Sequence, residues 1–548
     1  MRILLLVSAF NGLSQRAWCA LGEAGHDVGL HITKNSEDIT AGVRAAQPDL
    51  ILCPFLVDRV PEQVWSNWRT VVLRPGPLDR AIVDGAGSWG VSAVQAGGDQ
   101  VWAGRTFAMP AAPPRKGSLY NGPVSDAAME CLFETVEKAT DPEFTAPPGT
   151  DSPDARPAVT QADRAFGWAE PTGHILRRIR AADGSPGVRT EVGGLEVFAY
   201  DAHPGLAFRA QPGALLGRRQ GAVLVGTGDG AIWLGHLRDA AGPAIKLPAT
   251  TLLGARLRGV PNSPLGPGIE PETPSYRQIR YRRGGAVGWL AFDFYNGAMS
   301  TGHCRRLLAA FRHAAAQDTR VLVLRGGADS FSNGLHLNVI EQAADPAATA
   351  WANIKAFTAI AREIITCSRQ VVISAYAGSA SAGGALLGLG ADVVAARAGI
   401  VLNPYNDRGL HSAELHTYTL PRRVGAEAAR RLVDDRLPVS ATRAQSLGLV
   451  DEVGPRHPDA YTDWLTELAE RHSDARSARA KRAAKAKRLA AEPVPLDAYE
   501  ARELAELSQD VFADRSGFAE RRRAFVTKAP VDTPAALLAT SAPRPVHA

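Results

Sequence analysis

The sequence predicts a multidomain α/β protein, and three observations lead to this fold class. Strands and helices alternate over residues 2–56 and again over residues 286–378, the rhythm of parallel sheets covered by helices. Between them, over residues 195–237, short strands broken by glycines predict a small β-barrel of the OB type or a β-rich module. A chain of 548 residues is also too long for one hydrophobic core, so several domains are expected.

In the first α/β region, residues 2–10 (RILLLVSAF) predict a strand and residues 13–26 a helix that ends near Gly25. Two further strands, at 27–33 and 49–56, complete a βαβ pattern and indicate a Rossmann-like parallel sheet. The apolar run at the start is short and lacks a small-residue cleavage site, so it is typical of a strand rather than a signal peptide.

Two proline-rich segments separate the expected domains. EFTAPPGTDSPDARPA and GVPNSPLGPGIEPETPSY have the composition of linkers. A helical stretch, ILRRIRAADGSPG, precedes the short strands of the central module. The expected parts are a parallel α/β domain at 1–142, a linker at 143–158, a β module at 159–258, a linker at 259–276, a second α/β domain at 277–455 and a helical tail at 456–548.

The composition limits the classes of function. A hydrophobic content of 45%, with 21% charged residues, is typical of a globular protein. The net charge of +5 and the pI near 9.0 suit an anionic small ligand as well as a nucleic acid. No run of about 18 apolar residues exists, so no membrane span is predicted. We expect a cytoplasmic protein that acts on small molecules, without a nucleic-acid or membrane partner.

The cysteines predict neither disulfides nor a metal site. They are odd in number and scattered, without a C-x-x-C pair or a Cys/His cluster. They stand at Cys19, Cys53, Cys131, Cys304 and Cys367.

Two turns of the second α/β domain suggest an anion site. The segment DSFSNGLHLN at 329–338 ends a buried strand on small polar residues, and the Gly/Ala-rich run at 378–384 directly precedes a helix. Two strand-to-helix turns can each contribute one N–H group, and two converging N–H groups form an oxyanion hole for a thioester carbonyl. An ordinary strand–helix connection and tight helix packing are the alternatives.

These turns, with residues 422–453, resemble the crotonase (enoyl-CoA hydratase/isomerase) superfamily over roughly residues 275–455. The resemblance implies a ββα spiral fold. It also implies that the N–H groups of Leu335 and Gly383 hold the thioester oxygen, with Gly334 and Gly384 beside the bound coenzyme A.

The reacting carboxyl group is expected within residues 403–425. Asp407 suits the cap of its own turn, whereas Glu414 is flanked by tyrosines and histidines, and in an apolar, partly closed site it would have a raised pKa that suits proton transfer. We therefore predict Glu414 as the catalytic residue. Tyr405 and Tyr418 are further catalytic candidates, and packing is the alternative for both. No acidic residue lies within 378–391, which disfavours simple hydration because hydratases use two acidic groups.

The first half resembles the folate-dependent formyltransferases at VVLRPGPLDRAIVDGAGSWGVSAVQAG, residues 71–97, and in the following β module. This implies that 10-formyl-tetrahydrofolate binds near Arg74, Gly76 and Asp99. The formyltransferases have a histidine where this chain has Arg74, and arginine stays protonated and cannot act as a base. The loops are also shortened, which leaves Asp99 in place of the expected aspartate. Arg74 either binds an anion or forms a surface salt bridge, and the transfer half is either impaired or altered.

Over nearly its whole length the chain resembles the HypX (HoxX) family of hydrogenase maturation factors, with FDFYNGAMS, FSNGLHLNVIE and IVLNP. The resemblance implies formyl transfer from 10-formyl-tetrahydrofolate to coenzyme A, followed by decarbonylation of formyl-CoA to carbon monoxide for nickel–iron hydrogenase. It further implies hydrogenase maturation proteins as partners. A general acyl-CoA hydratase or isomerase and a non-catalytic maturation scaffold are the alternatives. The basic run at 476–488 is either a solvated helix face or a site for the phosphates of coenzyme A.

Overall fold

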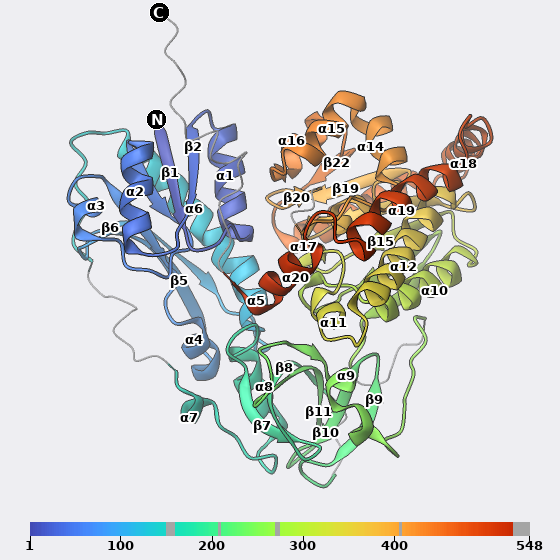
Figure 1. Ribbon diagram of the computed structural model, residues 1–548, viewed down its shortest axis with the longest axis horizontal. Coiled ribbons are helices and arrows are strands. Elements are labelled where there is room, and N and C mark those ends of the chain that lie inside the picture. The colour runs from blue at the N-terminus through green and yellow to red at the C-terminus, as the bar shows by residue number, and fades with distance from the viewer. Residues whose placement is uncertain (150–158, 206–209, 269–274, 405–407, 530–548) are drawn as a thin grey trace, which may run out of the picture.

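The computed structural model describes residues 1–149, 159–205, 210–268, 275–404 and 408–529 (Figure 1). Figure 1 shows an N-terminal α/β domain, a β module below it and a C-terminal α/β domain on the other side. The multidomain α/β prediction is therefore confirmed. In the described residues, no helix has the length and apolar character needed to cross a membrane.

The N-terminal domain is a six-stranded sheet in the order β2-β1-β3-β4-β5-β6. The strands are β1 (Arg2–Val7), β2 (Asp27–Ile32), β3 (Leu50–Cys53), β4 (Thr70–Arg74), β5 (Ser88–Gln95) and β6 (Val101–Ala108). The first four are parallel, and β5 and β6 are antiparallel to their neighbours. Side chains alternate along β1, so that Ile3 and Leu5 pack towards helices on one face and Leu4 and Leu6 towards the other.

Helices cover both faces of this sheet, which explains its nearly continuous apolar strands. The face that includes Leu5 packs against α1 (Gly12–Glu23) and α6 (Ser125–Ala139). The face that includes Leu6 packs against α2 (Ser36–Ala46) and α3 (Glu62–Trp65). The Rossmann-like arrangement expected for this half is thus present.

The β module is an open antiparallel sheet in the order β7-β8-β11-β10-β9, with β12 paired to β11. Its strands are β7 (Val188–Val192), β8 (Leu195–Pro204), β9 (Leu215–Arg219), β10 (Ala222–Gly226), β11 (Ala231–Asp239) and β12 (Leu247–Pro248). The β-rich module is therefore confirmed. Within the described residues, the edge strands β7 and β9 do not pair, so the module is an open sheet rather than a barrel. The apolar face is buried instead under α8 (Thr172–Ala181) and α9 (Ala249–Leu253), which removes the need for closure.

The C-terminal domain contains two sheets, and from β15 to β20 successive strands of the chain belong alternately to one and the other. The larger has the order β13-β14-β15-β17-β19-β22, and the smaller β16-β18-β20-β21. The larger sheet consists of β13 (Ile279–Gly284), β14 (Val287–Phe292), β15 (Val321–Arg325), β17 (Val371–Tyr376), β19 (Val393–Arg397) and β22 (Glu452–Gly454). The smaller consists of β16 (Ser330–Ser332), β18 (Ser379–Ser381), β20 (Val401–Asn403) and β21 (Val439–Ser440). Because β15, β17 and β19 are each followed by a short strand of the second sheet, the domain is a ββα spiral, as expected.

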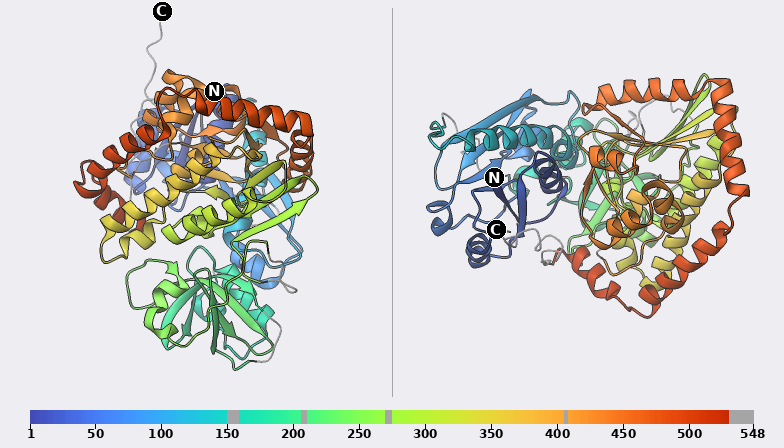
Figure 2. Two further views of the ribbon diagram at one scale, coloured as in Figure 1. Left: turned by 90° about the vertical axis from the view of Figure 1, so that its right-hand side faces the viewer. Right: turned by 90° about the horizontal axis from the view of Figure 1, so that it is seen from above.

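The C-terminal helices run along the outer side of the spiral (Figure 2, right). They are α17 (Pro458–His472), α18 (Ala475–Ala490), α19 (Leu496–Phe512) and α20 (Phe518–Thr527). Lys485, in the basic run, is buried and forms an ion pair with Asp392 at 3.2 Å, so this part of α18 faces the protein rather than solvent. Val526 of α20 packs against Leu247 of the β module, which links the helices to the rest of the molecule.

Candidate active site

The two strand-to-helix turns of the C-terminal domain lie side by side. They follow β16 and β18, which are parallel neighbours with Ser330 opposite Ser379. Parallel neighbours end at the same edge of a sheet, so the turns emerge together. A Cβ atom placed on Gly334 would lie 3.6 Å from the main-chain nitrogen of Gly383. The first turn is therefore in contact with the second.

The predicted donor amides are available in both turns. On the first turn, the N–H groups of Asn333, Gly334 and His336 donate to Gly297 O at 2.7 Å, Ser332 Oγ at 3.1 Å and Met299 O at 3.2 Å. Among the described residues, the intervening N–H of Leu335 has no acceptor. Gly383 is the first residue of α13 (Gly383–Leu386), and its amide precedes the first hydrogen bond within the helix.

The glycines of these turns are needed for different reasons. Gly334 has φ +79°, in the left-handed region that glycine adopts without strain. A Cβ on Gly384 would overlap the carbonyl oxygen of Ser332, so this glycine allows α13 to pack against β16. A Cβ on Gly383 would lie 2.6 Å from Glu414 Oε1. The lack of a side chain at Gly383 thus leaves room for the carboxyl group of Glu414.

Glu414 is buried, with 5% of its surface exposed, beside the second turn. Burial, with a further contribution from the negative charge of Glu503, raises the pKa of Glu414 to about 8. A carboxyl group with this pKa exchanges a proton near neutral pH. Its position against Gly383 places it beside the start of α13.

Two buried residues near Glu414 were not predicted from the sequence. Burial raises the pKa of the Cys304 thiol, and the charge of Glu414 adds to this effect. Asn353 Nδ2 donates to Cys304 Sγ at 3.7 Å. They lie on α10 (Thr301–Ala315) and α12 (Pro346–Thr366), which are amphipathic helices without a local motif. In the sequence, these two positions have the same pattern as ordinary core residues, so the sequence could not single them out.

Of the two tyrosines predicted as catalytic, the structure describes only Tyr418. Tyr405, like Asp407, lies outside the described residues. Tyr418 packs with its ring centroid 5.5 Å from that of Tyr499 on α19, and the guanidinium of Arg422 lies 4.0 Å from the same ring. Tyr418 also belongs to an apolar cluster with Ile365. These contacts anchor α14 (His416–Val424) to α19, which is the packing alternative for Tyr418.

The residues predicted to bind folate do not form one site. Arg74 and Gly76 lie at the carboxyl end of β4, where Gly76 turns the chain with φ +63°. Asp99 is exposed in the turn between β5 and β6, which is at the opposite end because β5 runs antiparallel to β4. The five residues of β4 span roughly 16 Å. The prediction that Asp99 acts beside Arg74 is therefore wrong.

Other polar groups occupy the carboxyl ends of the parallel strands. Asn11 Nδ2 donates to the hydroxyl of Tyr120 at 3.2 Å, and Trp89 Nε1 donates to Pro75 O at 2.7 Å. Gln15 Oε1 on α1 accepts a hydrogen bond from Asn403 Nδ2 at 2.6 Å. This contact joins the N-terminal domain to β20 of the spiral, immediately beside the strand that leads into the second turn.

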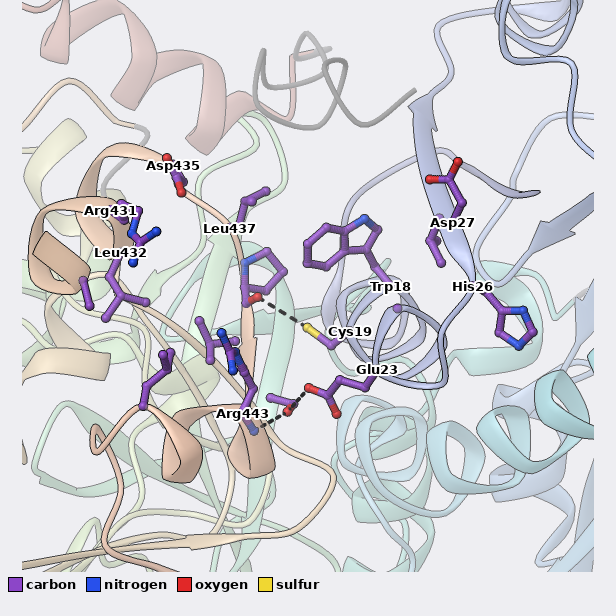
Figure 3. A pocket seen from close by; sticks show the side chains of 17 residues that line it. Trp18, Cys19, Glu23, His26, Asp27, Arg431, Leu432, Asp435, Leu437 and Arg443 are labelled. Carbon is purple, nitrogen blue, oxygen red and sulfur yellow. Dashed lines mark hydrogen bonds between the residues drawn. The ribbon is translucent and has the colours of Figure 1, made fainter. Parts of the chain in front are cut away.

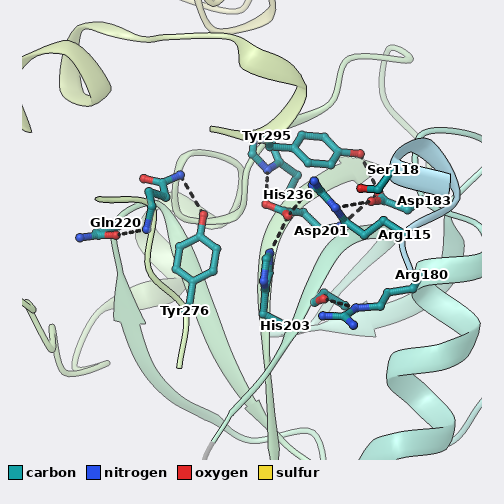
Figure 4. A network of polar contacts seen from close by, with 12 residues as sticks. Arg115, Ser118, Arg180, Asp183, Asp201, His203, Gln220, His236, Tyr276 and Tyr295 are labelled. Atoms are coloured by element: carbon teal, nitrogen blue, oxygen red, sulfur yellow. Dashed lines mark hydrogen bonds and ion pairs between the residues drawn. The ribbon is translucent and has the colours of Figure 1, made fainter. Parts of the chain in front are cut away.

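Arg115 connects all three parts of the molecule, and Figure 4 shows it beside Asp183 and Asp201. Its guanidinium forms ion pairs with Asp329 at 3.1 Å, Asp201 at 3.5 Å and Asp183 at 4.0 Å. Asp329 directly precedes β16, so the connection reaches the first turn. A cavity of about 150 Å³ at this junction is lined by Arg115, Asp183 and Asn333, among others. The first turn, through Asn333, therefore borders this cavity between the domains.

A larger cavity, of about 520 Å³, lies between α1 and the segment around β21 (Figure 3). Trp18 and Leu437 provide apolar lining from the two sides, and Cys19 Sγ donates to Pro438 O at 3.4 Å. Of the predicted site residues that the structure describes, none lines this cavity.

Comparisons with known proteins agree with this architecture. The enoyl-CoA hydratase/isomerase family model matches residues 295–529, and the model of the formyl transferase C-terminal domain matches residues 158–251. The hydrogenase maturation factor HoxX of Bradyrhizobium diazoefficiens is 38% identical over 97% of this chain and 95% of its own. The crystal structure of HypX from Aquifex aeolicus in complex with tetrahydrofolic acid is 34% identical, with a TM-score of 0.94 over 98% of both chains.

The fold and the paired turns define the class of protein: a fusion of a formyltransferase-like half with an enoyl-CoA hydratase/isomerase-like half. The similarity to HoxX and HypX extends over almost the whole length of both chains and therefore identifies the family. The chain belongs to the HypX (HoxX) family of hydrogenase maturation factors.

Proposed function

We propose that this protein makes carbon monoxide for the active site of nickel–iron hydrogenase. The first half transfers a formyl group from 10-formyl-tetrahydrofolate to coenzyme A, and the second half splits formyl-CoA into carbon monoxide and coenzyme A. The observation that carries the proposal is the buried carboxyl group of Glu414, which lies against Gly383 with a pKa raised to about 8.

The decarbonylation is a redox-neutral elimination. The N–H groups of Leu335 and Gly383 hold the thioester oxygen, and one such donor contributes about 3 kcal/mol of transition-state stabilisation. Ionised Glu414 takes the formyl proton, the electrons of the C–H bond become the lone pair of carbon monoxide, and the C–S bond breaks. The thiolate then takes the proton back from Glu414, so that a single carboxyl group serves both ends of the reaction.

Hydration of an enoyl thioester is less well supported by the same residues. A hydratase needs one carboxylate to activate water and a second acidic group to protonate carbon. Glu503, which acts electrostatically on Glu414, accepts hydrogen bonds on both oxygens, from Leu415 and Thr417. It is therefore engaged in holding the main chain. This arrangement favours chemistry that uses one carboxyl group.

The proposed formyl-transfer site lies at the carboxyl ends of the parallel strands of the N-terminal domain. Arg74, at the end of β4, has a permanent positive charge and suits an anionic part of the folate or of coenzyme A. It cannot remove a proton from the thiol of coenzyme A. The proposed transfer step therefore relies on a base other than the residue at this position.

The two steps can be tested separately with the full chain. Formyl-CoA is supplied in one reaction, and 10-formyl-tetrahydrofolate with coenzyme A in another, while deoxyhaemoglobin traps carbon monoxide. The proposal predicts carbon monoxide in both reactions. Release from formyl-CoA alone would restrict the activity to the second half, and turnover of crotonyl-CoA without carbon monoxide would identify a general acyl-CoA hydratase instead. Absence of any thioester turnover would favour a maturation scaffold.

A further inference from the structure

The main chain that carries Glu414 is held in an unfavourable conformation. Glu414 has φ +63° and Leu415 has φ +56°, two consecutive left-handed residues that both carry side chains. A left-handed conformation is unfavourable for a residue with a side chain, and it persists where surrounding contacts fix it. The segment is also the start of α14, whose first N–H groups have no partner within the helix. Contacts from elsewhere in the chain must therefore fix this segment.

Glu503, on α19 of the C-terminal helices, supplies those contacts. Its Oε2 accepts the N–H of Leu415 at 2.9 Å. Its Oε1 accepts the N–H of Thr417 at 2.9 Å and the hydroxyl of the same residue at 2.6 Å. His416 Nδ1 lies 3.1 Å from Oε1. One carboxylate thus binds three consecutive residues immediately after Glu414.

The surroundings of Glu503 lower its pKa and so favour its ionised form. It is almost completely buried, with 2% of its surface exposed. Burial alone would raise its pKa, but the hydrogen bonds from His416 and Thr417 outweigh burial and lower the pKa below its ordinary value. Its negative charge acts on Glu414 and contributes to the raised pKa of that residue. Two neighbouring carboxyl groups are therefore pushed in opposite directions by their surroundings.

We propose that Glu503 is a positioning residue of the candidate active site, which fixes the main chain that carries Glu414 and places a permanent negative charge beside its carboxyl group. The inference rests on the proposed role of Glu414 and extends the site to the C-terminal helices. A carboxylate on α19 then adjusts the proton affinity of a group on the spiral domain, without contacting the substrate.

Other titratable groups face this pair from several elements. They are Cys304 on α10, which interacts with Glu414, and His411 and His416, which interact with Glu503. Glu506 on α19 interacts with His411. Glu506 forms its own ion pair with Arg515 at 2.7 Å. The test must therefore report on Glu414 itself rather than on the pH dependence of the whole protein.

The direct experiment is an infrared pH titration of the Glu414 carboxyl band, assigned by its loss in Glu414→Gln. In Glu503→Gln, which keeps the shape of the side chain and removes its charge, the midpoint should fall by about one pH unit. An unchanged midpoint would overturn the proposal. The matched control is Glu500→Gln on the same helix, because Glu500 pairs with Arg362 at 2.5 Å instead, and this variant should keep the original midpoint.

A second variant tests the positioning role of Glu503 without removing its charge. It also provides a test if Glu503→Gln does not fold. Thr417→Val removes the hydroxyl hydrogen bond and leaves both carboxyl groups in place. Amide hydrogen exchange at Leu415 and Thr417 should become about fivefold faster. Unchanged exchange would contradict the positioning role. Neither readout requires substrate, so a shifted midpoint in a protein that releases no carbon monoxide would reject the proposed function and retain this inference.

Discussion

The carboxyl group of Glu414 occupies the space that a side chain at position 383 would fill. A Cβ atom on Gly383 would lie 2.6 Å from Oε1 of Glu414, so the second turn and the buried acid are in direct contact. The proposed reaction depends on this relationship, because the acid must reach the carbon whose oxygen the turn holds.

The first prediction concerns Gly383→Ala. The new methyl group displaces the Glu414 carboxyl, and we expect kcat for carbon monoxide release from formyl-CoA to fall at least tenfold while the protein stays folded. Steady-state kinetics and circular dichroism measure the two effects. The control is Gly302→Ala in α10, where the new Cβ would come no closer than 3.5 Å to the side chain of Arg306, and this variant should keep full activity. Unchanged kinetics in Gly383→Ala would show that Glu414 does not need its present position.

The pH dependence of decarbonylation follows from the pKa of Glu414, which burial raises to about 8. The ionised form accepts the formyl proton, so kcat/KM should rise about tenfold per pH unit below this value and level off above it. A stopped-flow assay of carbon monoxide release from pH 5.5 to 9.5 measures the profile. A plateau that begins near pH 5 would instead indicate a carboxyl group with an ordinary pKa.

The affinity for folate should depend on Arg74 and not on Asp99. Arg74→Ala removes a cation at the carboxyl end of β4, and we expect the Kd for 10-formyl-tetrahydrofolate to rise several-fold. Asp99→Ala changes an exposed residue at the opposite end of the sheet, and its Kd should equal that of the unmodified protein. Isothermal titration calorimetry measures both. Weaker binding in Asp99→Ala alone would mean that the folate site lies elsewhere.

Arg115 should be important for stability. Arg115→Gln leaves Asp183, Asp201 and Asp329 without their shared cation, and loss of one partner from a largely buried ion pair costs about 3 kcal/mol. The expected drop in Tm is measurable by calorimetry. Arg283→Gln breaks an exposed pair at 3.6 Å and should leave Tm unchanged. Equal effects of the two variants would contradict the role of Arg115 at the junction.

The sequence was sufficient for features that are encoded locally. Strand periodicity located the two α/β domains, and the small residues around Gly334 and Gly383 located the turns because few other residues fit there. Glu414 could be selected from a short segment because few carboxyl groups were available in it. The local pattern also indicated short strands in the β module, although not that helices would cover its open sheet.

Features that depend on long-range packing could not be predicted in this way. The formyltransferase resemblance places Asp99 in the position of the family's aspartate, beside Arg74, but the antiparallel direction of β5 puts it at the opposite end of the sheet. Glu503 lies 88 residues after Leu415, to which it binds, and its own helix gives no sign of this contact. Tyr418 was a candidate because of its neighbours in sequence, but its side chain packs against α19.

The most direct test of the central claim is single-turnover decarbonylation of formyl-CoA by Glu414→Gln. Glutamine keeps the size of the side chain and cannot accept the formyl proton, so we predict that carbon monoxide release slows by roughly a hundredfold or more while formyl-CoA still binds. Carbon monoxide release at the unmodified rate in this variant would contradict the assignment of Glu414 and the mechanism built on it.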